Sequence, residues 1–193
     1  MEKFRNTYRI QSTRLRGWDY SSNVAYFVTI CTDGYDHYFG DIKDGIMRLS
    51  EIGVIAHTEW FKSPELRPGM NIKLGAFVVM PNHIHGIITI GKNKYNQYRG
   101  DSNNRRDAMH CVSTTTPSLP SNKNQFGPQR KNLASIIRGY KSAVTKHARQ
   151  IDPDFAWQSR YYDHVIRNPE SDYGIRQYIQ NNVQNWSRDR LNQ

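Results

Sequence analysis

The triplet His83-Ile84-His85, in the middle of the chain, has the residue types and the spacing of half a metal site. In a β-strand, residues two apart point to the same face, so the two imidazoles would project side by side while Ile84 enters the opposite packing layer. The alternative is a polar face at the exposed end of a strand. Because the pair begins a strongly apolar strand, where two unpartnered rings would be costly, we favour a metal site that takes further ligands from elsewhere.

A second pair of residues that could take part in a reaction lies near the end of the sequence. Tyr178 and Asn182 are four apart in a segment with helical periodicity, which places them on one helix face, one turn apart. A phenol beside a carboxamide could supply an attacking oxygen and a neutral oxygen ligand to one metal. The alternative is that Tyr178 is an ordinary core residue in a stripe with Ile175 and Ile179, and the residues alone favour this alternative.

The elements that must position these residues follow from apolar periodicity and from capping residues. Apolar runs predict strands over residues 26–32, 46–49, 72–80 and 83–90, and the last two are joined at Pro81-Asn82. Because both are apolar on both faces, they are expected in the middle of a sheet that is covered by helices. Helices are predicted over residues 51–62, from Asn132 onward and from Pro169 onward, with Ser50, Asn132 and Asn168 as caps, and residues 157–166 are expected to be extended. This order indicates an α+β domain with a mainly antiparallel sheet and helices packed on it.

Length and composition bound the class of protein. The 193 residues suit one domain, here residues 1–193, with a basic N-terminal arm over residues 1–22 and an Asn-, Ser- and Thr-rich insertion over residues 92–131 that is expected to be flexible. No run of about 18 apolar residues exists, so we expect no membrane span, and the two cysteines are interpreted as reduced thiols of a cytoplasmic protein. Lys and Arg total 27 against 17 for Asp and Glu, a net charge of +10, which favours nucleic acid as partner, although such charge can also serve solubility alone.

Three motifs together resemble a known family. They are MPNHIHGII at residues 80–88, WQSRYYDHVIRN at residues 157–168 and YIQNN at residues 178–182. In this order they resemble the single-tyrosine HUH transposases, and within that superfamily they look most like the REP-associated tyrosine transposases. The resemblance covers residues 26–186 apart from the insertion. The chain departs from the family at Val183, where many members have proline, and in the length of the insertion.

The resemblance implies a fold, a reaction and a set of roles. The fold would be a ferredoxin-like α+β domain, and His83, His85 and Asn182 would bind a divalent metal, Mg or Mn. Tyr178 would attack single-stranded DNA at a hairpin such as a REP palindrome and form a 5′-phosphotyrosine intermediate. The insertion-sequence members of the superfamily are dimers, so the resemblance allows a homodimer, and it implies a bacterial protein that is associated with the nucleoid.

Other assignments remain open from the sequence. A hairpin-DNA-binding protein that has lost catalysis and a metal-dependent hydrolase that uses water would both fit the same residues. Plasmid replication initiators and relaxases share the chemistry, but the short chain and the Tyr-x-x-x-Asn helix fit transposases better. Tyr161 and Tyr162 are alternative nucleophiles, although packing or DNA contact is the favoured interpretation for both. Tyr140 is predicted to be a core residue, and His164 is predicted to be structural or to contact DNA. His110-Cys111 is rejected as a zinc site, because no second Cys/His pair stands at the spacing of a zinc finger.

Overall fold

A computed structural model describes residues 3–4, 7–8, 14–15, 17–96 and 130–192. The strands are β1 (Lys3–Phe4), β2 (Thr7–Tyr8), β3 (Val24–Cys31), β4 (Gly40–Lys43), β5 (Ile46–Leu49), β6 (Ile72–Val79), β7 (His83–Ile90) and β8 (Tyr162–Ile166). The α-helices are α1 (Glu51–Phe61), α2 (Leu133–Ala148) and α3 (Pro169–Asn181), and short 3-10 turns are η1 (Asp33–Tyr35), η2 (Pro68–Met70) and η4 (Trp186–Arg188).

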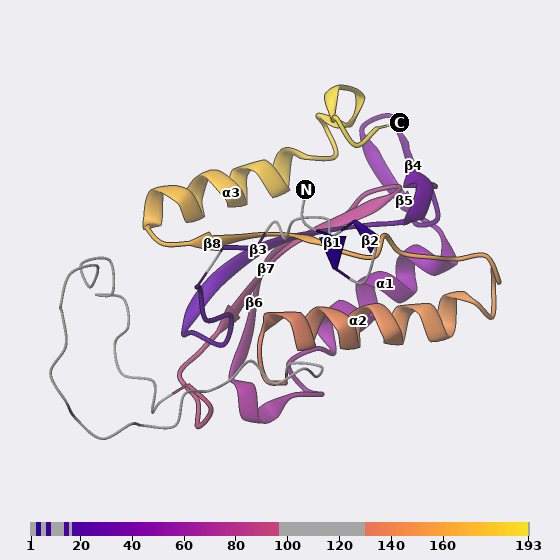
Figure 1. Ribbon diagram of the computed structural model, residues 1–193. Helices are drawn as coiled ribbons and strands as arrows, with labels where there is room; N and C mark the ends of the chain where they lie inside the picture. Colours follow the sequence, from indigo (N-terminus) through magenta and orange to yellow (C-terminus); the bar gives the residue numbers. More distant parts are fainter. Residues whose placement is uncertain (1–2, 5–6, 9–13, 16, 97–129, 193) are drawn as a thin grey trace, which may run out of the picture.

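The fold is built on a four-stranded antiparallel sheet with helices on both faces. The strand order is β6-β7-β3-β8, and β3, α1, β6, β7, α2 and β8 follow one another as the ferredoxin-like β-α-β-β-α-β unit. Helices α1 and α2 cover one face and α3 covers the other (Figure 1). The predicted fold class is therefore confirmed.

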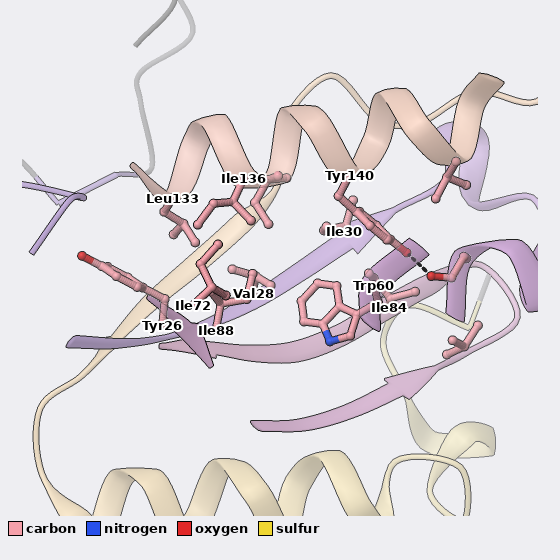
Figure 2. Close-up of a cluster of buried hydrophobic side chains, with 14 of the residues drawn as sticks. Tyr26, Val28, Ile30, Trp60, Ile72, Ile84, Ile88, Leu133, Ile136 and Tyr140 are labelled. Carbon is pink, nitrogen blue, oxygen red and sulfur yellow. Dashed lines mark hydrogen bonds between the residues drawn. The ribbon is translucent and has the colours of Figure 1, made fainter. Parts of the chain in front are cut away.

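The larger core lies between the sheet and α1 and α2. Alternate residues of β3 and β7 enter this core, as the period of two requires, and they meet residues of α2 and Trp60 of α1 (Figure 2). Tyr140, predicted as core, is buried there and its hydroxyl donates to the carbonyl of Ala56 at 3.0 Å. The opposite face carries a smaller apolar cluster under α3: Phe27, Ile87, Ile166 and Ile179.

The predicted helix starts are confirmed by their caps. The side chain of Ser50 accepts from the backbone N–H of Gly53, and Asn168 accepts from that of Ser171, at 3.0 and 2.8 Å. Asn132 forms a reciprocal capping box with Ser135. These bonds satisfy N–H groups that the first turn of a helix leaves without intrahelical partners.

Several predicted boundaries and placements were wrong. Strand β6 lies at an edge of the sheet and not in its middle, and its apolar residues are explained by α1 and α3, which contact its two faces. The strand predicted over residues 46–49 is confirmed as β5, and it pairs with β4 in a hairpin outside the four-stranded sheet. The apolar stripe of the helix predicted from Pro169 onward would continue to Trp186, but the helix ends at Asn181 and Trp186 lies in η4 beyond it.

Two predictions on organisation fall partly outside the described residues. Of the predicted insertion, residues 97–129 lie outside them, and so does part of the predicted arm, although Tyr20 at its end is buried in the larger core. Within the part of the chain that the structure describes, no helix has the length and apolar character to cross a membrane.

Gly86 allows close packing between β7 and α1 in the larger core and provides a test of it. A Cβ atom at Gly86 would overlap the Trp60 ring and would lie 3.1 Å from Cδ2 of Phe77, whose ring stacks on Trp60 at 4.6 Å. We expect Gly86→Ala to lower the free energy of unfolding by about 1–3 kcal/mol, as overpacking does. Gly174→Ala is the matched control, because a Cβ there meets nothing within 4 Å and alanine favours the α3 helix. Urea unfolding measures both, and equal stability of the two variants would contradict this packing.

Candidate active site

The two histidines of the sequence motif lie on the face of the sheet that α3 covers. Both are buried, and their Nε2 atoms are 3.0 Å apart. Ile84 between them enters the core on the opposite face. The side-by-side placement predicted from the spacing is confirmed.

Neighbouring polar groups fix the orientation of both rings. The Nδ1 atom of His83 is 2.7 Å from Oδ1 of Asn82, and Nδ1 of His85 is 2.8 Å from the hydroxyl of Thr29. Because an amide oxygen only accepts, His83 donates its Nδ1 proton and its Nε2 carries a lone pair. Both Nε2 atoms are thereby turned away from the strand, toward each other.

Burial keeps this pair of rings neutral. It lowers the pKa of His83 to about 4, with partial opposition from the Asp189 carboxylate. Burial, followed by the neighbouring His83 and by Arg190, lowers the pKa of His85 well below its usual value. Neutral imidazoles are the form that can donate a lone pair to a cation.

Helix α3 brings Tyr178 directly to this pair. The phenol oxygen is 3.2 Å from Nε2 of His85, and the two rings are 5.1 Å apart. The Tyr178 residue is 47% exposed, so solvent reaches part of its side chain. Burial, and next the charge of Asp189, raise the pKa of Tyr178, whereas a hydrogen bond from the Asn182 side chain and the charge of Arg190 lower it.

Asn182, the C-cap of α3, is buried beside the phenol. Its Oδ1 atom is a buried acceptor that has no hydrogen-bond partner among the described residues. A buried amide oxygen without a donor is unfavourable by about 1–3 kcal/mol, so such atoms call for an explanation. The structure thus brings together all four residues singled out in the sequence: His83, His85, Tyr178 and Asn182.

The sequence analysis missed Asp189. Its carboxylate and ring nitrogens of His83 and His85 all lie within 4.8 Å of one another. It follows η4, in a segment that is held to the histidine strand by Asn82, whose Nδ2 donates to the carbonyl of Leu191 at 2.7 Å. No periodic pattern marks Asp189, because it lies in irregular chain after the last helix.

His85, Tyr178, Asn182 and Asp189 line a cavity of about 800 Å³ between the sheet, α3 and the chain that follows α3. Its wall also includes aromatic and basic side chains: Phe27, Tyr35, Tyr161, Tyr162, Arg160, Arg188 and Arg190. Guanidinium groups match phosphate oxygens in charge and geometry. A phosphate diester placed in this cavity would meet arginines and a phenol together.

The alternative nucleophiles Tyr161 and Tyr162 line the same cavity, but their rings have other neighbours than Tyr178 has. Tyr161 packs against the larger core and its hydroxyl accepts from Arg14 at 3.0 Å. Tyr162 is half exposed and its ring contacts the edge of Phe27. His164 is exposed on β8, and the His110-Cys111 pair lies outside the described residues.

Comparisons with known proteins place the chain in a family. An uncharacterized protein of Haemophilus influenzae is 34% identical over 182 residues, which is 94% of this chain and 92% of the relative. The chain belongs to the same family as that protein. No family model matches the sequence.

One solved structure shares the fold. A REP-associated tyrosine transposase bound to a REP hairpin superposes with a TM-score of 0.56 at 19% identity, over 91% of this chain and 74% of that one. The resemblance drawn from the sequence motifs is confirmed at the level of the fold. The structure of a putative transposase from Deinococcus radiodurans has a TM-score of 0.39 at 13% identity, over 88% of this chain and 97% of that one.

Acid should destabilise the metal-free protein through the buried histidines. Between pH 6.5 and about 4, the histidine of the unfolded chain becomes protonated, whereas folded His83 stays neutral. The unfolded state therefore binds more protons than the folded state, and the free energy of unfolding falls as the pH falls. We expect the free energy of unfolding, measured with chelator present, to decline through this window. In His83→Gln the decline should be shallower. The same slope in both proteins would show that His83 is not kept neutral by the fold.

Proposed function

We propose that this chain is a metal-dependent single-stranded DNA endonuclease and strand transferase, transposase-like, whose nucleophile is Tyr178. The observation that carries the proposal is the contact of the Tyr178 oxygen with Nε2 of His85 at 3.2 Å, beside the second imidazole. This contact sets a half-exposed phenol against a buried neutral imidazole, which is the arrangement that a nucleophile beside a metal site requires. The shared fold with a REP-associated transposase supports the same assignment.

The donor set fits a divalent cation. Two neutral Nε2 atoms lie 3.0 Å apart, the Asn182 oxygen is buried without a partner among the described residues, and the Asp189 carboxylate adds negative charge. We assign His83, His85 and Asn182 as ligands, with Asp189 as a further oxygen donor. Mg or Mn held by these residues would neutralise charge on the scissile phosphate.

The reaction itself is a transfer between oxygens. The Tyr178 oxygen attacks the phosphorus, the bond from phosphorus to O3′ breaks, and the product is a 5′-phosphotyrosine with a free 3′-hydroxyl. The proton lost by the phenol is balanced by the one that O3′ gains. Because one phosphodiester replaces another, the bond energy is kept and the step can reverse, which joins strands without a nucleotide cofactor.

Side chains around the phenol have separable tasks. Asn182 and Arg190 favour the phenolate, against the burial and the Asp189 charge that raise its pKa. The cavity arginines suit the DNA backbone, and hairpin DNA is the substrate class that we assign, because the neighbour of shared fold was solved with a REP hairpin.

A covalent adduct is the decisive product. Purified protein is mixed with Mn and end-labelled hairpin oligonucleotides that carry randomised unpaired flanks, and denaturing gels detect DNA that stays attached to protein. We expect an adduct with the wild type and with Tyr173→Phe, an exposed tyrosine on the same helix, and none with Tyr178→Phe.

Each other outcome of this assay selects a different function. An adduct that persists in Tyr178→Phe would reject the nucleophile. Cleavage without adduct that survives this substitution would indicate a hydrolase that uses water. Hairpin binding with neither adduct nor cleavage would favour the non-catalytic hairpin-DNA-binding protein.

Metal binding can be measured without DNA. Mn at one hundred times its dissociation constant should stabilise the folded chain by about 2.7 kcal/mol, which appears as a rise of the unfolding temperature. We expect His83→Gln to abolish most of that rise and Asp189→Asn to reduce it, whereas His147→Gln, on the exposed side of α2, should leave it unchanged. A full rise in the His83 variant would remove that histidine from the ligand set.

A further inference from the structure

The position of Tyr162 points to a second feature of the cavity. Tyr162 begins β8 and is paired with Thr29 of β3, which is itself paired with His85 of β7. The three residues form one row across the sheet and point to the face that α3 covers. Since neighbouring strands lie about 4.8 Å apart, the Tyr162 backbone is roughly 10 Å from that of His85.

The Tyr162 ring contacts the buried Phe27 ring and is half exposed. Its centroid is 6.2 Å from that of Phe27, at an interplanar angle of 69°, and Phe27 is buried. Phe27 in turn stacks on His85 at 5.4 Å and meets the edge of the Tyr178 ring at 6.1 Å. Phe27 therefore connects Tyr162 to the nucleophile through ring contacts, and Tyr162 keeps 50% of its surface exposed on the cavity wall.

A half-exposed aromatic ring on a supported wall, beside arginines, has the features of a nucleobase platform. Every base has a π-face, and stacking on an aromatic side chain contributes about 1–3 kcal/mol per base in single-stranded DNA complexes. Tyr173 offers a contrast, because it is 67% exposed on α3 but does not line the cavity. Tyr162 and Tyr173 are both exposed, but only Tyr162 lines the same cavity as Tyr178.

We propose that Tyr162, supported by Phe27, is the stacking platform for one unpaired base next to the scissile phosphate. The inference rests on the proposed function and adds to it a subsite for a base. Its ligand is an unpaired nucleobase of single-stranded DNA, and its geometry assigns the Tyr162 ring rather than its hydroxyl.

Binding is measured by fluorescence anisotropy in the Tyr178→Phe background, so that no DNA is cut. The probes are a hairpin that the wild type cleaves, the same hairpin with a single abasic site moved along its unpaired flank, and a blunt hairpin. Should no hairpin be cleaved, the randomised-flank pool takes its place. We expect Tyr162→Leu to weaken binding of the intact flanked hairpin by about 5- to 100-fold, because the stacked ring is lost.

The remaining arms of the experiment identify the partner of the ring. Tyr162→Phe should bind like Tyr162, and Tyr173→Leu should have no effect. When the abasic site stands at one position beside the cleaved phosphate, or when the hairpin is blunt, Tyr162→Leu should not weaken binding any further. Thermal unfolding of each variant verifies that it is folded.

Failure of this inference is distinguishable from failure of the proposed function. An equal loss of affinity for intact and abasic DNA in Tyr162→Leu, or an equal loss in Tyr162→Phe, would overturn the platform while leaving the adduct intact. Absence of an adduct from wild-type protein would instead overturn the proposed function. The anisotropy measurements on intact and abasic DNA would still test whether the Tyr162 ring stacks on a base. Absence of any DNA binding would overturn both.

Discussion

The register between β3 and β7 is the constraint on which the candidate site depends. It pairs Thr29 with His85 and Ile30 with Ile84, so that the histidine face and the core face of β7 are fixed at once. A slip of one residue would send both imidazoles into the larger core and would move Ile84 out of that core to the face that bears the cavity. Burial of one isoleucine is favourable by about 1.5–3 kcal/mol and an unpartnered buried polar group is unfavourable by a similar amount, so both terms oppose the slip. The apolar residues therefore specify where the polar ones lie.

The same register explains how the rings are oriented. Thr29 is opposite His85 because of strand pairing, and its hydroxyl reaches Nδ1. Asn82, in the turn before β7, bonds His83 with its oxygen and the carbonyl of Leu191 with its nitrogen. One buried amide thus links the histidine strand to the chain end that bears Asp189. Ring orientation and the place of the carboxylate are coupled through a single side chain.

Sequence patterns predicted the parts of this arrangement that are local. The period of two over residues 83–85 and the caps at Ser50, Asn132 and Asn168 depend on neighbours within a few residues. Asp189 could not be found in this way, because its segment is brought to the histidines by contacts between residues far apart in the sequence, such as those of Asn82 with Leu191 and of His83 with Trp186. The edge position of β6 was missed for a related reason: two covering helices give an edge strand the same apolar pattern as a central one. The roles of Tyr178 and Asn182 came from family resemblance, since a helical stripe alone is compatible with a core position.

The electrostatic design of the cavity follows from what burial does to each group. Burial removes charge from the imidazoles, so the positive potential of the cavity comes from arginines on its wall, while Asp189 opposes it beside the rings. Burial also raises the pKa of Tyr178, which works against a phenolate. Neutral rings beside a carboxylate attract a cation, and a cation in turn favours an anionic oxygen nearby. The burial that disfavours a Tyr178 phenolate therefore also keeps the neighbouring imidazoles neutral, which is the form that the proposed function requires for holding a cation.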